Sequence, residues 1–162
     1  MKRIILLIAA TSLLLSCKQE NTFPKKTEWQ EVAIGANVLP LSLRIPENED
    51  VNVHARWNET FGRLELIGEN NNEIFIRESL MTCADKKNEL AADIFDVSYI
   101  EESDTMLVYK TSVPGGDEYY WNVFASIQAD TSHYIIEQNP LIAYDQKAIT
   151  QMATIIKRIK AN

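Results

Sequence analysis

The sequence predicts an α+β domain, in which an antiparallel sheet of about seven to nine short strands packs with one inserted helix and one C-terminal amphipathic helix. From Trp29 onward, most segments alternate apolar and polar residues and end at a turn signal. Only one central and one C-terminal segment show the apolar spacing of a helix. Because the strand count approaches eight, a lipocalin-like β-barrel with a C-terminal helix is the alternative.

The first strands are predicted from alternating side chains in residues 41–45, 51–57, 63–66 and 73–78. In 51–57 the polar face carries His54 and Arg56, which is typical of a strand with one face in water. Pro46 and the asparagine-rich residues 68–72 mark turns between these strands.

Residues 82–92 interrupt the alternation and predict the inserted helix. Thr82 followed by Asp85 is a start signal for a helix. At helical spacing, the residues that share its apolar face are Cys83, Leu90, Ala91 and Ile94.

A second group of strands is predicted in residues 95–99, 106–110, 119–128 and 133–138. An acidic turn at 101–104 and the strong turn signal Pro114–Asp117 separate them. The strand 119–128 is apolar on both faces. One face carries Tyr119, Trp121, Val123, Ala125 and Ile127, and the other carries Tyr120 and Phe124.

The C-terminal helix is predicted to begin after Asp145, which can cap it. Its apolar stripe at helical spacing consists of Ile149, Met152, Ile156 and Ile159. Lys157, Arg158 and Lys160 would complement the dipole at its end.

This order of elements resembles the PsbP-like fold, an antiparallel sheet packed between helices. The resemblance covers most of residues 41–160 and rests on the order of elements, including a first strand that ends in Ile45-Pro46. The strands between Val51 and Glu78 depart from the family's pattern. The family consists mainly of accessory and binding proteins without shared catalytic residues, so the resemblance implies no site residue.

The N-terminus carries the pattern of a secretory signal. Lys2 and Arg3 precede an apolar run from Ile4 to Leu15, which is too short for a spanning helix of about twenty residues. The last residues, Leu14-Leu15-Ser16-Cys17, resemble the lipobox of bacterial lipoprotein precursors. That resemblance implies cleavage between Ser16 and Cys17, lipid on the Cys17 thiol and an acyl group on the new amine. Since two or more acyl chains hold firmly, the mature protein would be anchored to a membrane.

The resemblance also implies a location in the cell envelope. Lys18 occupies the position where an Asp would resemble an inner-membrane retention signal, which favours the outer membrane. The charged segment Lys18-Gln19-Glu20 resembles a surface-export signal, so both the periplasmic and the surface face remain open. The expected organisation is a signal peptide at 1–16, a lipidated cysteine with a flexible tether at 17–28, and a single domain at 29–162.

The charge of the chain restricts its partners. The net charge of −7 becomes −9 after cleavage, because residues 1–16 contain Lys2 and Arg3 and no acid. An acidic protein of this kind is not expected to bind nucleic acid or to adhere to anionic lipid by charge.

No catalytic residue, metal site or cofactor is predicted. Histidine pairs at metal-ligand spacing, a Gly-x-Ser-x-Gly elbow, a phosphate loop and a dinucleotide fingerprint are all missing from the sequence. The acidic clusters at 47–50, 101–104 and 117–118 lack the alternating oxygen ligands and the glycine bend of a calcium loop. Cys83 is expected to be a buried apolar side chain, with a reactive thiol as the alternative. His54 and His133 are expected at the surface or beside a turn.

The function expected from these features is that of a membrane-anchored, non-enzymatic accessory module that binds a protein or another envelope ligand, in the manner of an immunity protein or inhibitor. The candidate contact surface is the aromatic run Tyr119, Tyr120 and Trp121. Two alternatives remain open: a carrier of a small hydrophobic ligand, and a small hydrolase or thiol enzyme that uses Cys83 or His54.

Overall fold

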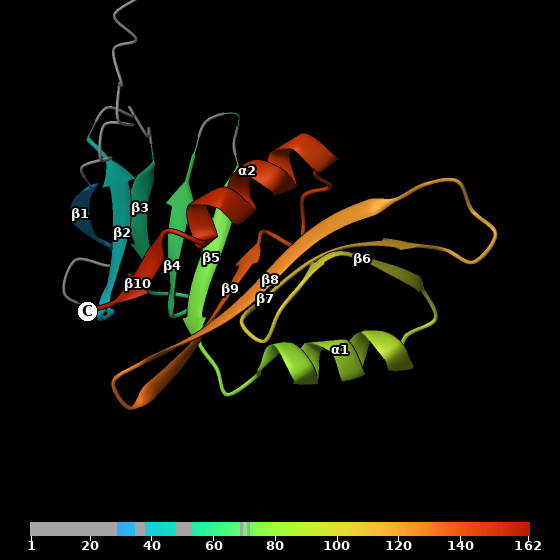
Figure 1. The fold of residues 1–162 in the computed structure, drawn as a ribbon, viewed down its shortest axis with the longest axis horizontal. Coiled ribbons are helices and arrows are strands. Elements are labelled where there is room, and N and C mark those ends of the chain that lie inside the picture. Colours follow the sequence, from blue (N-terminus) through green and yellow to red (C-terminus); the bar gives the residue numbers. More distant parts are fainter. Residues whose placement is uncertain (1–28, 35–37, 48–52, 69, 71) are drawn as a thin grey trace, which may run out of the picture.

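The computed structural model describes residues 29–34, 38–47, 53–68, 70 and 72–162, and its architecture is α+β, as predicted. The elements follow one another as shown in Figure 1: β1 (Trp29–Ile34), β2 (Leu41–Pro46), β3 (His54–Asn58), β4 (Arg63–Ile67), β5 (Glu73–Glu78), α1 (Cys83–Ala92), β6 (Asp96–Glu102), β7 (Met106–Ser112), β8 (Tyr120–Ala129), β9 (Ser132–Gln138), α2 (Gln146–Ile156) and β10 (Ile159–Ala161).

The strands form two antiparallel sheets. The larger sheet has seven strands in the order β3-β4-β5-β9-β8-β7-β6, and the smaller sheet has three in the order β1-β2-β10. In the described residues the outer strands of the larger sheet, β3 and β6, do not pair with each other. The lipocalin-like barrel is therefore wrong, because a barrel requires its first and last strands to pair.

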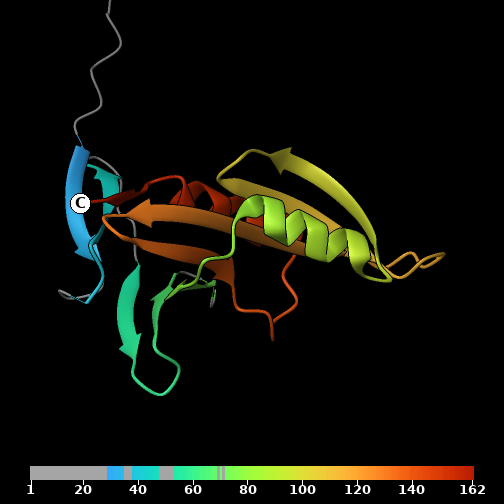
Figure 2. The same ribbon diagram turned by 90° about the horizontal axis from the view of Figure 1, so that it is seen from below.

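The larger sheet lies between two unequal layers (Figures 1 and 2). Helix α2 and the smaller sheet cover one side, the α2 face, and helix α1 covers part of the other side, the α1 face. Strand alternation divides β8 between them as predicted, with Val123 and Ala125 in the core on the α2 face and Phe124 in the cluster under α1. One apolar core thus joins both sheets with α2.

The predicted start of α1 is confirmed. The Thr82 hydroxyl oxygen accepts a hydrogen bond from the backbone N–H of Asp85 at 3.1 Å, and the Asp85 carboxylate accepts one from the backbone N–H of Thr82 at 2.9 Å. The predicted apolar face is only half correct. Cys83 and Leu90 are buried. Ala91 lies within the helix but is exposed, and Ile94 is exposed because the helix ends before it, at Ala92.

The predicted start of α2 is also confirmed, since the Asp145 carboxylate accepts a hydrogen bond from the backbone N–H of Ala148 at 2.7 Å. The predicted end is wrong. The helix stops at Ile156, and Ile159 begins β10, where it pairs with Leu43 of β2. The Arg158 carbonyl accepts a hydrogen bond from the backbone N–H of Arg44 at 3.0 Å. The backbone after Ile156 therefore pairs with β2 and does not continue the hydrogen bonds of the helix. Lys157 is the C-cap, and Lys160 lies in the strand.

The expected acidic turn at 101–104 is shorter than predicted, because β6 continues to Glu102. A bulge between Tyr99 and Glu101 adds one residue to β6, so that Glu101 lies opposite Val108. The turn is closed by a hydrogen bond from the backbone N–H of Ser103 to the Met106 carbonyl at 2.9 Å.

Candidate functional site

The predicted lipid anchor lies outside the described residues. Ser16, Cys17 and the boundaries at 16 and 28 therefore stay predictions. Of the helices in the described ranges, none combines the length and the apolar character needed to cross a membrane.

Cys83, the candidate thiol, is enclosed at the first turn of α1. It is 1% exposed, and its sulfur lies 3.7 Å from the Ser126 hydroxyl oxygen. Burial raises the pKa of Cys83, and the hydrogen bonds from Ser126 do not reverse this. A thiol that is enclosed and protonated is a poor nucleophile, so this geometry agrees with a packing role.

The two histidines lie on other elements. His54 lies on the outer strand β3, opposite Ile67. It is exposed, as predicted from its place on the polar face of the strand. His133 lies at the start of β9, opposite Gln128. The structure does not bring either of them into a hydrogen bond with Cys83, whose partner is Ser126.

The acidic clusters are paired or solvated where the structure describes them. Glu101 accepts a hydrogen bond from Lys157 at 2.8 Å, and Glu102 forms an ion pair with Lys87. Asp117 and Glu118 are exposed in the turn before β8. Among the described residues, no three His, Cys, Asp or Glu side chains are grouped so that they could hold a metal ion.

The aromatic run at the start of β8 divides between surface and core. Tyr119 is 51% exposed and Tyr120 is 45% exposed, whereas Trp121 is half-buried against the core and its backbone bridges to Tyr144. The Lys110 ammonium lies 4.0 Å from the centre of the Tyr119 ring and fixes it by a cation–π contact. Of the three candidates, Tyr119 and Tyr120 are therefore available to a partner.

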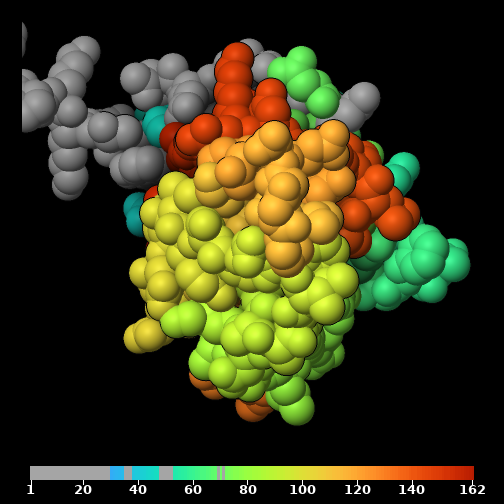
Figure 3. Space-filling model, turned by 90° about the vertical axis from the view of Figure 1, so that its right-hand side faces the viewer, coloured from blue at the N-terminus to red at the C-terminus, as the bar shows by residue number. Residues whose placement is uncertain are grey.

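Three further apolar side chains accompany these tyrosines. Ile94 and Phe95 precede β6, and Val113 follows β7, at the edge where Asp96 pairs with Ser112 and Thr111 pairs with Tyr120. We call this end of the larger sheet the apolar end. Its exposed apolar residues are Ile94, Phe95, Val113, Tyr119 and Tyr120. Tyr119 lies beside Lys110, on the opposite side of the strand from Tyr120. Figure 3 looks onto it, with the orange β7–β8 connection beside the yellow-green residues that follow α1.

The turn beneath the apolar end is well defined. Gly115 has φ of +77°, a backbone conformation that glycine adopts readily, and the backbone N–H of Gly116 donates to the Val113 carbonyl at 2.8 Å. The predicted turn at Pro114–Asp117 is thereby confirmed. It sets the positions of Val113 and Tyr119 on either side of it.

The rim of the apolar end is acidic. Its two loop segments, 93–96 and 113–120, contain Asp93, Asp96, Asp117 and Glu118 and no basic residue, and all four acids are exposed. The Lys110 ammonium lies over the Tyr119 ring, and Lys110 belongs to neither loop segment. An apolar patch with acidic borders is suited to a basic partner.

Sequence reasoning missed Ile94 and Phe95 as surface residues, because the helical spacing placed Ile94 on the inner face of α1. The signal that could have located them is Asp93, directly before Ile94. It is the C-cap of α1, so the two apolar residues after it lie beyond the helix.

A charged cluster on the α1 face was also missed. Glu65 of β4 is 3% exposed and accepts hydrogen bonds from Arg56, Asn58 and Arg63, which together form the Glu65 cluster. The Arg63 guanidinium carbon lies 3.5 Å from the centre of the Phe75 ring and 4.8 Å from that of Phe61. The polar faces of 51–57 and 63–66 contained these residues, but the sequence did not show that they share one face of paired strands.

The chain was compared with family models, curated proteins and solved structures. No family model, no curated protein and no solved structure matches it. The resemblance to the PsbP-like fold therefore stays a prediction.

Proposed function

We propose that this chain is an envelope lipoprotein held at the outer membrane by lipid on Cys17, and that its domain is a non-enzymatic binding module for a protein partner. The observation that carries the binding role is the apolar end. Five exposed aromatic and aliphatic side chains at one end of the sheet are more than the single scattered ones that are normal on a protein surface, and such concentrations are typical of interaction sites.

The composition of the apolar end fits a protein partner. Tyrosine is enriched among the residues that dominate binding energy, because it offers a large apolar area and a hydroxyl with few rotatable bonds. The Tyr119 ring is already held by Lys110, so less side-chain freedom is lost on binding.

The charge of the rim supports a basic partner. Asp93, Asp96, Asp117 and Glu118 would steer a cationic surface toward the tyrosines, and the chain as a whole is acidic. Immunity proteins and inhibitors work on this principle, so a basic toxin or envelope enzyme is the class of partner that we favour.

The enzyme alternative has less support. Its nucleophile, Cys83, is enclosed with a raised pKa, and its base, His54, is exposed on an outer strand without a hydrogen bond to that thiol. A nucleophile and its base need hydrogen-bond proximity, even if looser in the free enzyme.

The binding role can be tested by photo-crosslinking in cells that express the full chain. A benzoylphenylalanine at Tyr120 should capture a discrete protein, which can then be identified and purified. The same group at Leu80, which is exposed in the β5–α1 connection away from the apolar end, should not capture it.

Direct binding of the identified protein then decides the proposal. Tyr119→Ser with Tyr120→Ser should weaken binding by roughly thirtyfold, as expected for loss of a hot spot. The matched variant Leu80→Ser should leave it unchanged. Equal affinity in all variants, or capture at Leu80 as strong as at Tyr120, would contradict the role of the apolar end.

The anchor is tested separately. Cys17→Ser should leave an unprocessed precursor without lipid, whereas the parent chain should incorporate labelled fatty acid and partition into the detergent phase. Unchanged acyl labelling of Cys17→Ser would exclude the lipobox interpretation.

A further inference from the structure

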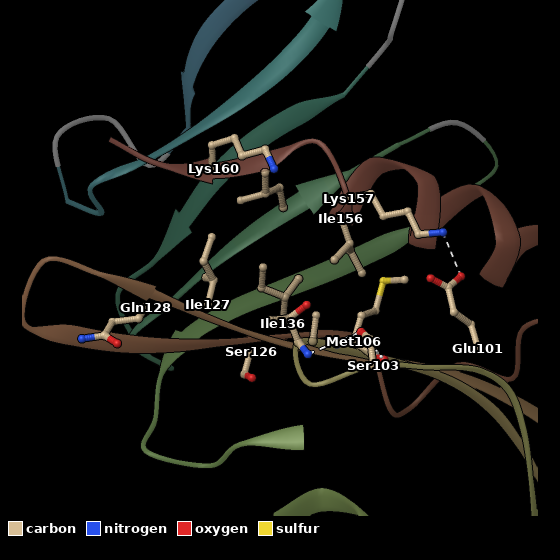
Figure 4. A pocket seen from close by; sticks show the side chains of 13 residues that line it. Glu101, Ser103, Met106, Ser126, Ile127, Gln128, Ile136, Ile156, Lys157 and Lys160 are labelled. Carbon is tan, nitrogen blue, oxygen red and sulfur yellow. Dashed lines mark hydrogen bonds and ion pairs between the residues drawn. The ribbon is translucent and has the colours of Figure 1, made fainter. Parts of the chain in front are cut away.

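The α2 face carries a groove that shares no residue with the apolar end. It lies where α2 stops, between the end of that helix with β10 and the strands β7, β8 and β9 beneath them (Figure 4). Its volume is about 390 Å³, within the range of small-molecule sites. We call it the α2 groove.

The groove exists because the cover of the sheet changes at Ile156. Up to that residue a helix lies on the larger sheet, and beyond Arg158 the cover is the short strand β10. Ile156 and Ile159, from α2 and β10, form the roof, and Met106, Ala125, Ile127 and Ile136, from the strands beneath, form the floor. Figure 4 shows Ile156, Met106, Ile127 and Ile136 around this space.

The walls are suited to an aliphatic group. Every residue of the roof and floor is apolar, and all except the half-buried Ile127 are buried. The polar residues Ser103, Thr105, Ser126 and Gln128 also line the groove, but most of its surface is apolar. A lining of aliphatic side chains offers dispersion contacts to an aliphatic chain.

The mouth is cationic, in contrast to the acidic chain. It carries Lys157, Lys160 and Glu101, and therefore one net positive charge. Lys157 donates to Glu101 at 2.8 Å, across the mouth. Among the described residues, no acidic side chain forms an ion pair with Lys160, so this ammonium is available for an anionic group.

Neither part of the groove alone specifies a ligand, but the combination does. A free phosphate would make no favourable contact with the apolar walls, and a hydrocarbon would make no ionic contact with the lysines. We propose that the α2 groove binds a single-chain amphiphile with an anionic head, of the fatty-acid type, with the chain between roof and floor and the carboxylate at Lys160.

Photolabelling of the full chain in its own membranes tests this, with a diazirine analogue of dodecanoic acid as the probe. Adducts should map to the peptides that contain residues 101–106, 125–128 and 156–160. Adducts spread evenly over the chain would overturn the proposal.

Three variants decide whether charge and space act as proposed. Lys160→Glu should lower labelling by roughly tenfold, because one attraction is replaced by one repulsion. Ala125→Leu, which fills the floor, should lower it further. Glu101→Gln should raise labelling by roughly fivefold, because it frees Lys157, and a misfolded protein could not show that gain.

The controls separate this proposal from the one above. Lys147→Glu changes an exposed lysine in the first turn of the same helix and should leave labelling unchanged, as should the double substitution at Tyr119 and Tyr120. The methyl ester of the probe should label roughly tenfold less. Equal labelling by acid and ester, or by wild type and Ala125→Leu, would overturn the proposal.

Discussion

The two faces of the larger sheet differ in how they are covered. On the α2 face, α2 buries Ile149, Met152, Ala153 and Ile156 in a core that it shares with both sheets. On the α1 face, α1 buries only Cys83 and Leu90, and beyond the helix Phe75 is covered by the Arg63 guanidinium. One face therefore holds the domain together by apolar burial, and the other combines a small apolar cluster with charged side chains.

The largest expected effect is the truncation of Met152 on α2, which is fully buried. Met152→Ala should lower the free energy of unfolding by about 3 kcal/mol, since it removes apolar contacts and leaves a cavity. Leu90→Ala on α1 should lower it by about 2 kcal/mol, because Leu90 lies at the margin of its cluster. Urea unfolding of both variants measures the difference, and a larger loss for Leu90→Ala would show that the faces have been ranked incorrectly.

The next effect is that of Glu65→Gln on the α1 face. The amide would still fill the space but would leave Arg56 and Arg63 without their carboxylate, which should lower the free energy of unfolding by about 1–3 kcal/mol. Glu137→Gln is the matched control, because Glu137 has one ion pair, with Arg77 at 3.5 Å, and is more exposed. Its effect should be at most about 0.5 kcal/mol. Equal losses would show that the Glu65 cluster contributes no more than a surface ion pair.

The Glu65 effect should also depend on pH. Burial raises the pKa of Glu65, but hydrogen bonds from Arg56, Asn58 and Arg63 outweigh it and hold the pKa below its ordinary value of 4.5. A lowered folded pKa means that the stabilisation is complete above 4.5 and is lost as the pH falls through the folded value. The stability gap between wild type and Glu65→Gln should therefore be widest at neutral pH and shrink at about pH 3. Urea midpoints at both pH values check this, and a constant gap would argue against it.

The smallest effect concerns the cap of α1. Thr82→Ala removes the hydrogen bond to the backbone of Asp85 and should lower the free energy of unfolding by about 1 kcal/mol. Thr150→Ala, in the interior of α2 and exposed, should be neutral or stabilising, since alanine favours the helix. The shift in urea midpoint distinguishes the two, and an unchanged midpoint for Thr82→Ala would mean that α1 does not need its cap.

Local patterns predicted most of the fold. Alternation located the strands from Leu41 to Gln138, and the caps Thr82 and Asp145 located both helix starts, because these signals depend on neighbouring residues. The ends of the helices were less predictable. Ile159 continued the spacing of α2, but pairing with Leu43, far away in the chain, outweighed it.

The candidate surface was predicted only in part, for the same reason. Tyr119 and Tyr120 stood out because they are adjacent aromatics with alternating directions. Ile94, Phe95 and Val113 join them only through the register of β6, β7 and β8, which no local pattern specifies. The Glu65 cluster likewise depends on the register of β3 with β4.

The pairing of β2 with β10 also bears on the order in which the chain folds. The smaller sheet is complete only when Ile159 of β10 pairs with Leu43 of β2. Because β10 is the last element of the chain, one edge of β2 stays unpaired until the strands of the larger sheet and α2 have been synthesised. Contacts between such distant segments form late, since a long loop must first close. On our proposal that the chain is exported N-terminus first, β2 would cross the membrane before β10 could pair with it, and the smaller sheet would be completed only on the far side.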